Sequence, residues 1–385
     1  MIIVIADDIT GAAEIAGIAS RHGLDTQLIT RLREPLPAAD VAVIATDTRS
    51  ASEAEAVKTM RDTAAFILSQ RNARTDAADT PLVIFKKTDS VLRGHIMAEA
   101  RALTDVFGQG SALLIPQNPS KERIIKDGIY YVKGIGLSDT AFRDDPEFPA
   151  LTSNVTEILS GAHSLSVEEK MVEGINIADA TNSDDIRRQI SKAGDNTLVA
   201  GAADCFEALL EKLARAGTGS SADESSKPQI AIPHPSTLLV VCGSTQSRSL
   251  KDEPYIKNMC AEEIGVPDDV FHGGDPATWM ERLERSYAAN GSLVMKIGRP
   301  SEGGKAYAVR LRSLMSEAAT RLINMRRPQC LIIEGGATAY ALLMRTGWHS
   351  FAVRGEIAPG VVCMSRDGID IILKPGSYAW GGLFG

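Results

Sequence analysis

Aromatic residues are scarce in this chain of 385 residues, where Phe, Trp and Tyr together make up 5%. All-β sandwiches draw on aromatic and β-branched side chains, so this composition does not favour one. Glycine, with 33 residues, and alanine are plentiful instead. Small residues let helices pack closely on a sheet, and the composition therefore favours a sheet covered by helices.

Long apolar runs are missing as well. No segment reaches the roughly 18 apolar residues of a membrane span. The apolar run Met1–Ile5 is too short for a signal peptide, has no basic flank and leads into Asp7 and Asp8. We therefore expect a cytoplasmic protein that does not insert into a membrane.

Positive charge is in deficit, since 41 Lys and Arg face 49 Asp and Glu and leave a net charge of −8. An acidic surface argues against nucleic acid or an anionic membrane as partner. It leaves room for a small anionic substrate, because a few cations gathered in a cleft are enough to bind one. The oligomeric state stays open.

The five cysteines are odd in number and contain no C-x-x-C pair, and the six histidines do not pair at ligand spacing. We therefore expect each cysteine to be a small buried apolar residue rather than a metal ligand or a nucleophile. The cysteines are Cys205, Cys242, Cys260, Cys330 and Cys363.

Several catalytic motifs are also absent. No G-x-G-x-x-G follows a predicted strand, which leaves a nicotinamide dehydrogenase with little support, and H-E-x-x-H and G-x-S-x-G do not occur. The segment Gly298–Lys305 resembles a Walker A loop but is one residue too long and has no Ser or Thr after the lysine. We interpret it as a turn before a helix.

What the chain does contain is an alternation of short β-branched runs with helical patterns, which is typical of a parallel sheet covered on both faces. The predicted strands are Ile2–Ala6, Thr26–Thr30, Val41–Thr46, Leu82–Lys86, Ala112–Ile115, Leu198–Ala200, Leu238–Cys242, Ser292–Ile297 and Cys330–Glu334. The predicted helices are Gly11–His22, Ser52–Gln70, Ile96–Phe107, Cys205–Arg215, Gln246–Glu263 and Lys305–Met325, with short strands after Ser350.

The domain division follows from one segment of low apolar content. Residues 217–236 are rich in Gly, Ser and Pro and are predicted to be a linker. The fold class is therefore α/β with two domains, 1–216 and 237–385, each a largely parallel sheet covered by helices. We expect the active site in the cleft between them.

Polar clusters follow several strands of the N-terminal domain. In open parallel sheets, ligands bind beyond the carboxyl ends of the strands. The clusters are Asp7-Asp8 with Thr10-Gly11, Asp47–Ser50, Lys86–Ser90 with Arg93-Gly94, and Gln117-Asn118.

These residue types suit a small polyhydroxy acid. Arg49, Arg93 and Ser90 can hold a carboxylate, and Lys87 supplies a point charge. Asp7, Asp8 and Asp89 can accept hydrogen bonds from hydroxyl groups or remove a proton from one. A structural interpretation competes: Asp8, Thr10 or Ser90 can simply cap the following helix, and Lys86 can belong to the strand, on the face opposite Lys87.

The C-terminal domain carries glycine turns between a strand and a helix at Cys242–Thr245 and at Glu334–Thr338, and Lys374–Ser377 can approach the same place. Such turns offer free backbone N–H groups to phosphate. Each turn alone is weak evidence, since glycine also serves close helix packing.

The order of these motifs resembles that of the four-carbon acid sugar kinase family. The resemblance spans nearly the whole chain. It is carried by Ala6–Ala12, Asp47–Ser50, Lys86–Gly94, Gly128–Pro146, Gly243-Ser244, Gly335–Thr338, Glu356–Gly360 and Lys374–Gly376.

The resemblance implies transfer of a phosphoryl group from ATP, with Mg²⁺, to the terminal hydroxyl of threonate, erythronate or a 3-oxo-tetronate. Together with the residue chemistry, it gives Asp7, Asp8, Arg49, Lys87, Thr88, Asp89, Ser90 and Arg93 as substrate-binding residues. The implied nucleotide-binding residues are Ser244, Gly335, Gly336, Ala337, Thr338 and Gly376. The general base is Asp8 or Asp89, and the residues that would hold the metal are not identified.

The family pattern is altered in the C-terminal domain. Ala337 stands where the family has an acidic or polar residue, Thr245-Gln246 replaces Cys-Ser, and the segment Ser377–Gly381 differs. The alternative function is therefore a protein that binds or senses a sugar acid and has lost or altered its use of a nucleotide.

Overall fold

Two α/β units make up the described part of the chain. The computed structural model describes residues 1–32, 35–73, 82–145, 147–217, 230, 235–244, 248–299 and 304–376. Unit 1 comprises Met1–Thr26 and Arg31–Ser226, and unit 2 comprises Gln27–Thr30 and Lys227–Gly385. Most of the predicted linker and all of the altered segment Ser377–Gly381 lie outside the described residues.

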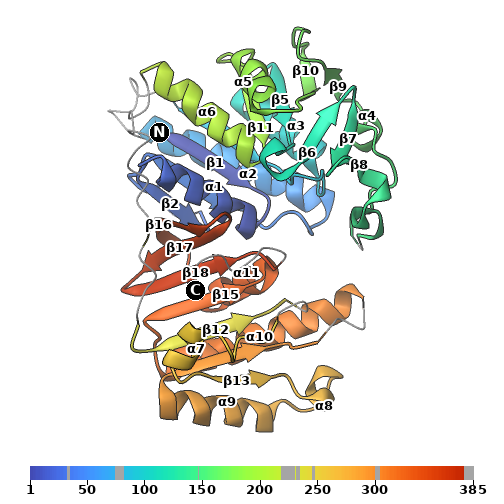
Figure 1. The fold of residues 1–385 in the computed structure, drawn as a ribbon. Helices are drawn as coiled ribbons and strands as arrows, with labels where there is room; N and C mark the ends of the chain where they lie inside the picture. Colours follow the sequence, from blue (N-terminus) through green and yellow to red (C-terminus); the bar gives the residue numbers. More distant parts are fainter. Residues whose placement is uncertain are drawn as a thin grey trace. The chain divides into compact units, whose positions relative to one another are not determined.

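The main sheet of unit 1 has the strand order β3-β1-β4-β11-β5-β10-β9, and every neighbouring pair is parallel (Figure 1). The strands are nearly continuous apolar runs because both of their faces are buried. Their bounds are β1 Ile2–Ala6, β3 Val41–Ala45, β4 Val83–Lys87, β5 Ser111–Ile115, β9 His163–Leu165, β10 Gly174–Ala178 and β11 Thr197–Gly201.

Helices cover both faces of this sheet (Figure 1). Helices α1 (Ile9–Arg21), α5 (Ser183–Ser191) and α6 (Ala203–Arg215) pack together, and α2 (Glu53–Ala73) packs on α3 (Ile96–Phe107). The two lysines that end β4 show that these sets lie on opposite faces. Lys86 pairs with Glu99 of α3, whereas Lys87 approaches Glu14 of α1. The prediction that Lys86 and Lys87 lie on opposite faces is confirmed.

A small antiparallel sheet interrupts unit 1 between β5 and β9. It consists of β6 (Arg123–Lys126), β7 (Ile129–Val132) and β8 (Ile135–Gly136). One short 3₁₀ helix precedes it at Pro119–Lys121, two follow within residues 137–144, and the short helix α4 (Val155–Ile158) comes after them. The sequence pattern predicted only a long loop region here.

The sheet of unit 2 has the order β13-β14-β12-β15-β18-β17-β16-β2. Its first five strands are parallel, and β17, β16 and β2 continue it antiparallel. The strand bounds are β2 Thr26–Ile29, β12 Leu238–Cys242, β13 Glu262–Gly265, β14 Ser292–Lys296, β15 Cys330–Glu334, β16 Ser350–Ala358, β17 Val361–Arg366 and β18 Ile369–Lys374. The helices are α7 Pro254–Asn258, α8 Asp268–Phe271, α9 Ala277–Asn290, α10 Lys305–Met325 and α11 Gly336–Arg345.

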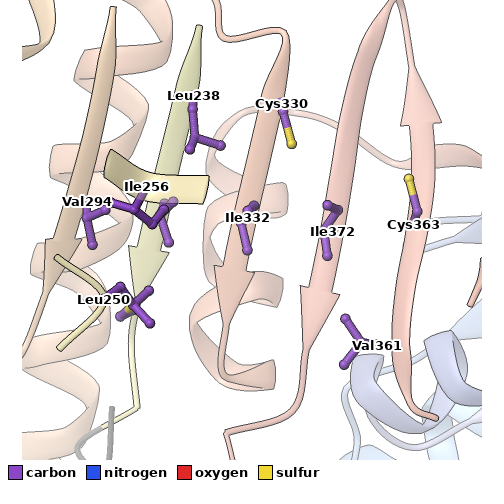
Figure 2. Packing of buried hydrophobic residues seen from close by; sticks show 11 residues of the cluster. Leu238, Leu250, Ile256, Val294, Cys330, Ile332, Val361, Cys363 and Ile372 are labelled. Carbon is purple, nitrogen blue, oxygen red and sulfur yellow. The ribbon is translucent and has the colours of Figure 1, made fainter. Parts of the chain in front are cut away.

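One face of this sheet carries a closed apolar core, in which Leu238, Ile332 and Ile372 from neighbouring strands point to the same side (Figure 2). Ile256 of α7 and Leu250 cover them. The fold is therefore the α/β class that the pattern predicts, with a mostly parallel sheet and helices.

Strand β2 belongs to a different unit from the one that the predicted domain boundaries give it. The predicted N-terminal domain 1–216 contains this strand, but Gln27–Thr30 groups with unit 2 because Phe351 of β16 pairs with Leu28. The Thr30 N–H also donates to the carbonyl of His349 at 3.0 Å. An apolar strand pattern in the sequence does not predict which sheet edge the strand will join.

The predicted helix over Gln246–Glu263 is wrong. Among the described residues of this stretch, 248–263, only Pro254–Asn258 is helical, and β13 begins at Glu262. The carboxylate of Glu263 pairs with Lys296 at 2.9 Å and accepts the backbone N–H of Leu250 at 2.6 Å, so it holds strand and loop together. Within the described part of the chain, no helix is long and apolar enough to cross a membrane.

Candidate active site

The order in which unit 1 adds its strands reverses at the carboxyl ends of β1 and β4. From β1 the chain passes to β3 on one side, and from β4 it passes to β5 on the other. Such a reversal separates the two following loops and is where open α/β sheets bind ligands. Ala6 and Lys87 are register partners at these ends, so the clusters after β1 and β4 start side by side. Arg49, after β3, reaches the same place.

Arg49 is the centre of the cluster. Its guanidinium forms a two-pronged pair with Asp7, with Nε–Oδ2 at 2.7 Å and Nη2–Oδ1 at 3.0 Å. The same Nη2 donates to Asp8 at 2.8 Å, and Nη1 lies 3.5 Å from Asp89. Burial opposes the charge on Arg49, but the three carboxylates outweigh it and raise its pKa well above the ordinary value. Arg49 therefore joins the three strand-end clusters with most of its N–H groups already engaged.

Asp8 caps helix α1, as the structural interpretation expects, and it also belongs to the charge cluster around Arg49. Its role toward a substrate stays a prediction. Its Oδ1 accepts the N–H of Gly11 at 3.0 Å, and its Oδ2 accepts the hydroxyl of Thr10. Burial alone would raise the pKa of Asp8, but the charges of Arg49 and Lys87 and the Thr10 hydrogen bond lower it below 3.8. The carboxylate is therefore ionised at neutral pH.

Gly11 has no room for a side chain in this cap. A Cβ atom there would lie 2.6 Å from Oδ1 of Asp8 and 3.1 Å from Nζ of Lys87. The missing side chain lets the ammonium group and the carboxylate approach the first turn of α1 together. Gly11 is therefore required for the close approach of Asp8 and Lys87 to the start of α1.

Asp89 is held more tightly than Asp8. Its Oδ1 accepts the N–H of Val91 at 2.9 Å and Nε of Arg93 at 3.1 Å, and its Oδ2 accepts Nη2 of Arg93 at 2.9 Å. Burial opposes ionisation, but Arg49, Arg93 and these hydrogen bonds hold its pKa far below the ordinary range. The same bonds close a turn in which Leu92 and Gly94 have positive φ angles of 66° and 90°.

Lys87 is buried with its ammonium group over α1. Nζ donates to the carbonyl of Thr88 at 2.8 Å and lies 3.8 Å from Glu14, which in turn pairs with Lys121 at 2.6 Å. The hydroxyl of Thr88 is buried and has no hydrogen-bond partner among the described residues. A buried unpaired hydroxyl is rare in proteins, and a ligand hydroxyl or carboxylate can satisfy it.

Several predicted cluster members have structural roles. Gln117 donates to the carbonyl of Ala178 at 2.9 Å, and Asn118 accepts the N–H of Asp204 at 3.1 Å, at the start of α6. The Nε2 atom of His95 lies 2.8 Å from the carbonyl oxygen of Ala51.

Sequence reasoning missed the residues that reach the site from the inserted segment. Arg123 donates to the Ser90 hydroxyl, the phenol of Tyr130 donates to the Ser90 carbonyl, and Asp145 accepts from Arg93 at 3.3 Å. The guanidinium carbons of Arg93 and Arg123 lie 5.9 and 5.7 Å from the ring centre of Phe142. The resemblance covers this segment, but no periodicity there links it to the strand ends.

Unit 2 repeats the strand-order reversal at β12 and β15. From β12 the chain passes towards β13 on one side, and from β15 it passes towards β18 on the other. Gly243 and Thr338 touch so closely that a Cβ atom on Gly243 would collide with the threonine side chain. A Cβ atom on Gly376 would lie 3.0 Å from the Ser244 hydroxyl oxygen. The predicted nucleotide-binding segments therefore come together at one edge of unit 2.

The first turn of α11 offers backbone N–H groups to a ligand. Its N-cap is Gly335, whose φ angle of 100° suits glycine and which has no side chain to accept these N–H groups. Ala337 keeps its backbone N–H, so the missing polar side chain does not remove this donor. Below the turn, Glu334 and Lys374 form a buried ion pair at 2.7 Å. These residues fit phosphate groups, which bind readily at such helix starts. Of the Walker-like segment, residues 300–303 lie outside the described part.

The fold defines an α/β protein with two strand-end clusters. Charged side chains make up the cluster of unit 1, and glycine turns make up the cluster of unit 2. Residues 2–230 match the family model described as a sugar-binding N-terminal domain, and residues 268–378 match the one described as a nucleotide-binding C-terminal domain. The chain belongs to the four-carbon acid sugar kinase family.

Two relatives match almost the full chain, and a third matches less than half of it. A D-threonate kinase of Salmonella typhimurium is 23% identical over 98% of this chain and 95% of its own length. A 3-oxo-tetronate kinase of Brucella melitensis is 26% identical over 97% of this chain and 92% of its own. A D-erythronate kinase of Heliobacterium modesticaldum is 30% identical over 43% of this chain and 37% of its own.

The fold is shared with solved structures. The crystal structure of Haemophilus influenzae protein HI1011 matches with a TM-score of 0.71 and 18% identity, covering 99% of this chain and 98% of the other.

Proposed function

We propose that this protein transfers the γ-phosphoryl group of ATP to the terminal hydroxyl of a four-carbon sugar acid of the threonate, erythronate or 3-oxo-tetronate type. The family assignment and the full-length relatives named as kinases of such acids support the reaction class. The observation that carries the substrate half is the ion cluster that Asp7, Asp8 and Asp89 form around Arg49. Carboxylates beside cations can hold hydroxyl groups and an acid group at once.

Asp8 is the better general base of the two candidates. Asp89 already accepts backbone and guanidinium N–H groups on both oxygens, and its pKa lies far below the ordinary range. Asp8 accepts fewer donors, and its side chain is 17% exposed against 7% for Asp89. We assign Asp8 to orient the attacking hydroxyl and take its proton, and Asp89 to position Arg93.

The nucleotide half of the proposal places the phosphates of ATP at Ser244, the turn Gly335–Thr338 and Gly376. The first turn of α11 and the glycines that allow close approach support it. Mg²⁺, when bound, would neutralise the phosphate charge, and such ions are held largely by phosphate oxygens and water.

A coupled assay of ADP release tests the proposal directly. The enzyme is offered Mg-ATP with each stereoisomer of threonate and erythronate and with 3-oxo-tetronates, and ³¹P NMR then identifies the phosphorylated oxygen. We expect one acid to be preferred and its terminal oxygen to be modified. Absence of ADP release with every acid, from folded protein, would refute the kinase proposal.

Two variants test the assignment of the base. Asp8→Asn should lower kcat about 10²- to 10⁴-fold, as loss of a general base does. Asp62→Asn is the matched control, because Asp62 is exposed on α2 and, among the residues that the structure describes, its ion pair is with Lys58. If Asp8→Asn kept kcat, Asp8 would not be the base. Sugar-acid binding without ADP release by the unaltered protein would favour the alternative, a sugar-acid binding protein.

A further inference from the structure

Arg123 differs from the other cations of the unit 1 cluster in what it contacts. Arg49 is paired with three carboxylates, Arg93 with Asp89 and Asp145, and Lys87 and Lys121 share Glu14. Among the residues that the structure describes, Arg123 has no carboxylate partner, and its hydrogen bond goes to the hydroxyl of Ser90. Among these five cations, Arg123 is therefore the one whose positive charge is not balanced by a carboxylate of the described residues.

The position of Arg123 is fixed by its surroundings. It opens β6, and its guanidinium lies over the ring of Phe142 at 5.7 Å. Cation and ring in this geometry attract each other. The Phe142 ring thus holds the guanidinium in place, while its N–H groups form no hydrogen bond to a carboxylate of the described residues.

Ser90 is held in place from both sides. The phenol of the fully buried Tyr130 donates to the Ser90 carbonyl, and the turn after it is closed by Asp89. Because the Ser90 oxygen accepts from Arg123, its own proton stays available to another acceptor. The guanidinium and the hydroxyl therefore present donors to one place beside the strand-end cluster.

We propose that Arg123, together with Ser90, binds the carboxylate of the sugar acid. The assignment rests on the proposed function and names the group that recognises the acid end of its substrate. A guanidinium binds a carboxylate in a planar two-pronged geometry, which matches an arginine whose charge is unpaired. Arg49 and Arg93, which sequence reasoning placed on the substrate carboxylate, organise the cluster through Asp7, Asp8, Asp89 and Asp145.

The test measures binding of the sugar acid without nucleotide, by calorimetry with D-erythronate, D-threonate and L-threonate. Arg123→Gln should weaken the best-bound acid on the order of 10- to 100-fold, the loss expected for a charged hydrogen bond. The affinity of Arg123→Lys for the acid should lie between those of Arg123→Gln and the unaltered protein, since lysine keeps the charge and loses the planar geometry. Arg143→Gln is the control, because Arg143 is an exposed arginine in the same inserted segment.

The corresponding tetritol, which carries a hydroxymethyl group in place of the carboxylate, separates recognition of the acid from loss of structure. The unaltered protein should prefer the acid, and Arg123→Gln should bind acid and tetritol about equally. If Arg123→Gln does not fold, Ser90→Ala and Arg123→Lys still have to lower this preference.

The outcomes distinguish the two proposals. An Arg123→Gln variant that binds the acid within twofold of the unaltered protein would overturn the role of Arg123. Binding of the acid that depends on Arg123, without phosphoryl transfer, would refute the kinase proposal and support this one. If the unaltered protein bound no sugar acid, both would fail.

Discussion

Replacing Arg49 with glutamine should destabilise unit 1 far more than removal of an ordinary surface arginine. The Arg49 side chain is 18% exposed, and those of Asp7 and Asp89 are 5% and 7% exposed. Removing one partner of a buried ion pair costs about 3–5 kcal/mol, because the remaining charge is left uncompensated. Arg49→Gln removes a cationic partner from three carboxylates, of which Asp89 keeps Arg93 and Asp8 keeps the nearby charge of Lys87, so we expect a loss within this range.

The loss should depend on pH. In the native protein the pKa values of Asp8 and Asp89 are lowered, so their ionised forms contribute stability above the ordinary value of 3.8 and lose it as the pH falls through the lowered values. Arg49 is the strongest of the charges that lower both. Without Arg49, both pKa values should rise, because one fewer charge then opposes the effect of burial. The penalty of Arg49→Gln should therefore be complete above the ordinary value of 3.8 and should shrink as the pH falls below it, so it should be larger near pH 7 than near pH 3.

Denaturant unfolding followed by far-UV circular dichroism measures this effect, with tryptophan fluorescence as a second probe. All three tryptophans, Trp279, Trp348 and Trp380, belong to unit 2, so the two signals help to separate the units. Arg61→Gln is the control, because Arg61 is 57% exposed and its partner Asp105 lies at 3.7 Å. An exposed pair of this kind contributes about 0–1 kcal/mol. Equal losses for the two variants, or a loss for Arg49→Gln that is as large near pH 3 as near pH 7, would refute the reasoning.

Three further outcomes follow from the geometry. Because the pKa of Asp8 is lowered, kcat/KM of the proposed reaction should show no acidic limb above about pH 5, and a limb near neutrality in the pH profile would argue against Asp8 as the base. Gly243→Ala should lower the affinity for ADP and the melting temperature of unit 2 through its collision with Thr338, whereas Gly265→Ala, whose Cβ meets nothing within 4 Å, should change neither. Cys260 is the exposed cysteine, while burial raises the pKa of Cys363 to about 12, so a thiol reagent should modify a single cysteine in the native protein and all five after denaturation.

The elements of the fold followed closely from local pattern. The strands Ile2–Ala6 and Leu238–Cys242 and the helices Ile96–Phe107 and Lys305–Met325 have the bounds that the sequence predicts. Apolar runs in parallel strands and long periodic helices are strong local signals, because burial on a given face imposes a fixed spacing. The prediction of a helix over Gln246–Glu263 is wrong because β13, which begins at Glu262, pairs with β14 there, and the helical pattern of the sequence does not reveal this pairing.

The candidate site was predictable in part. Asp8, Arg49 and Lys87 stand next to strand ends, and the rule that ligands bind there brought them together before their contacts were known. The rule does not say which charges neutralise one another. It predicted that Arg49 binds the substrate, and this stays a prediction; in the structure the Arg49 N–H groups face Asp7, Asp8 and Asp89. Pairing depends on distances that linear spacing does not encode.

By itself, the sequence determined the α/β class and the polar residues that end the strands of each sheet, because these depend on local periodicity and on chain order. Only the tertiary structure decided that Gln27–Thr30 joins the sheet of unit 2, that Glu14 links two lysines, and that Arg123 meets Ser90. Ser90 and Arg123 are 33 positions apart. Contacts of that kind arise when a sheet and an inserted segment pack in three dimensions, and no local pattern fixes them.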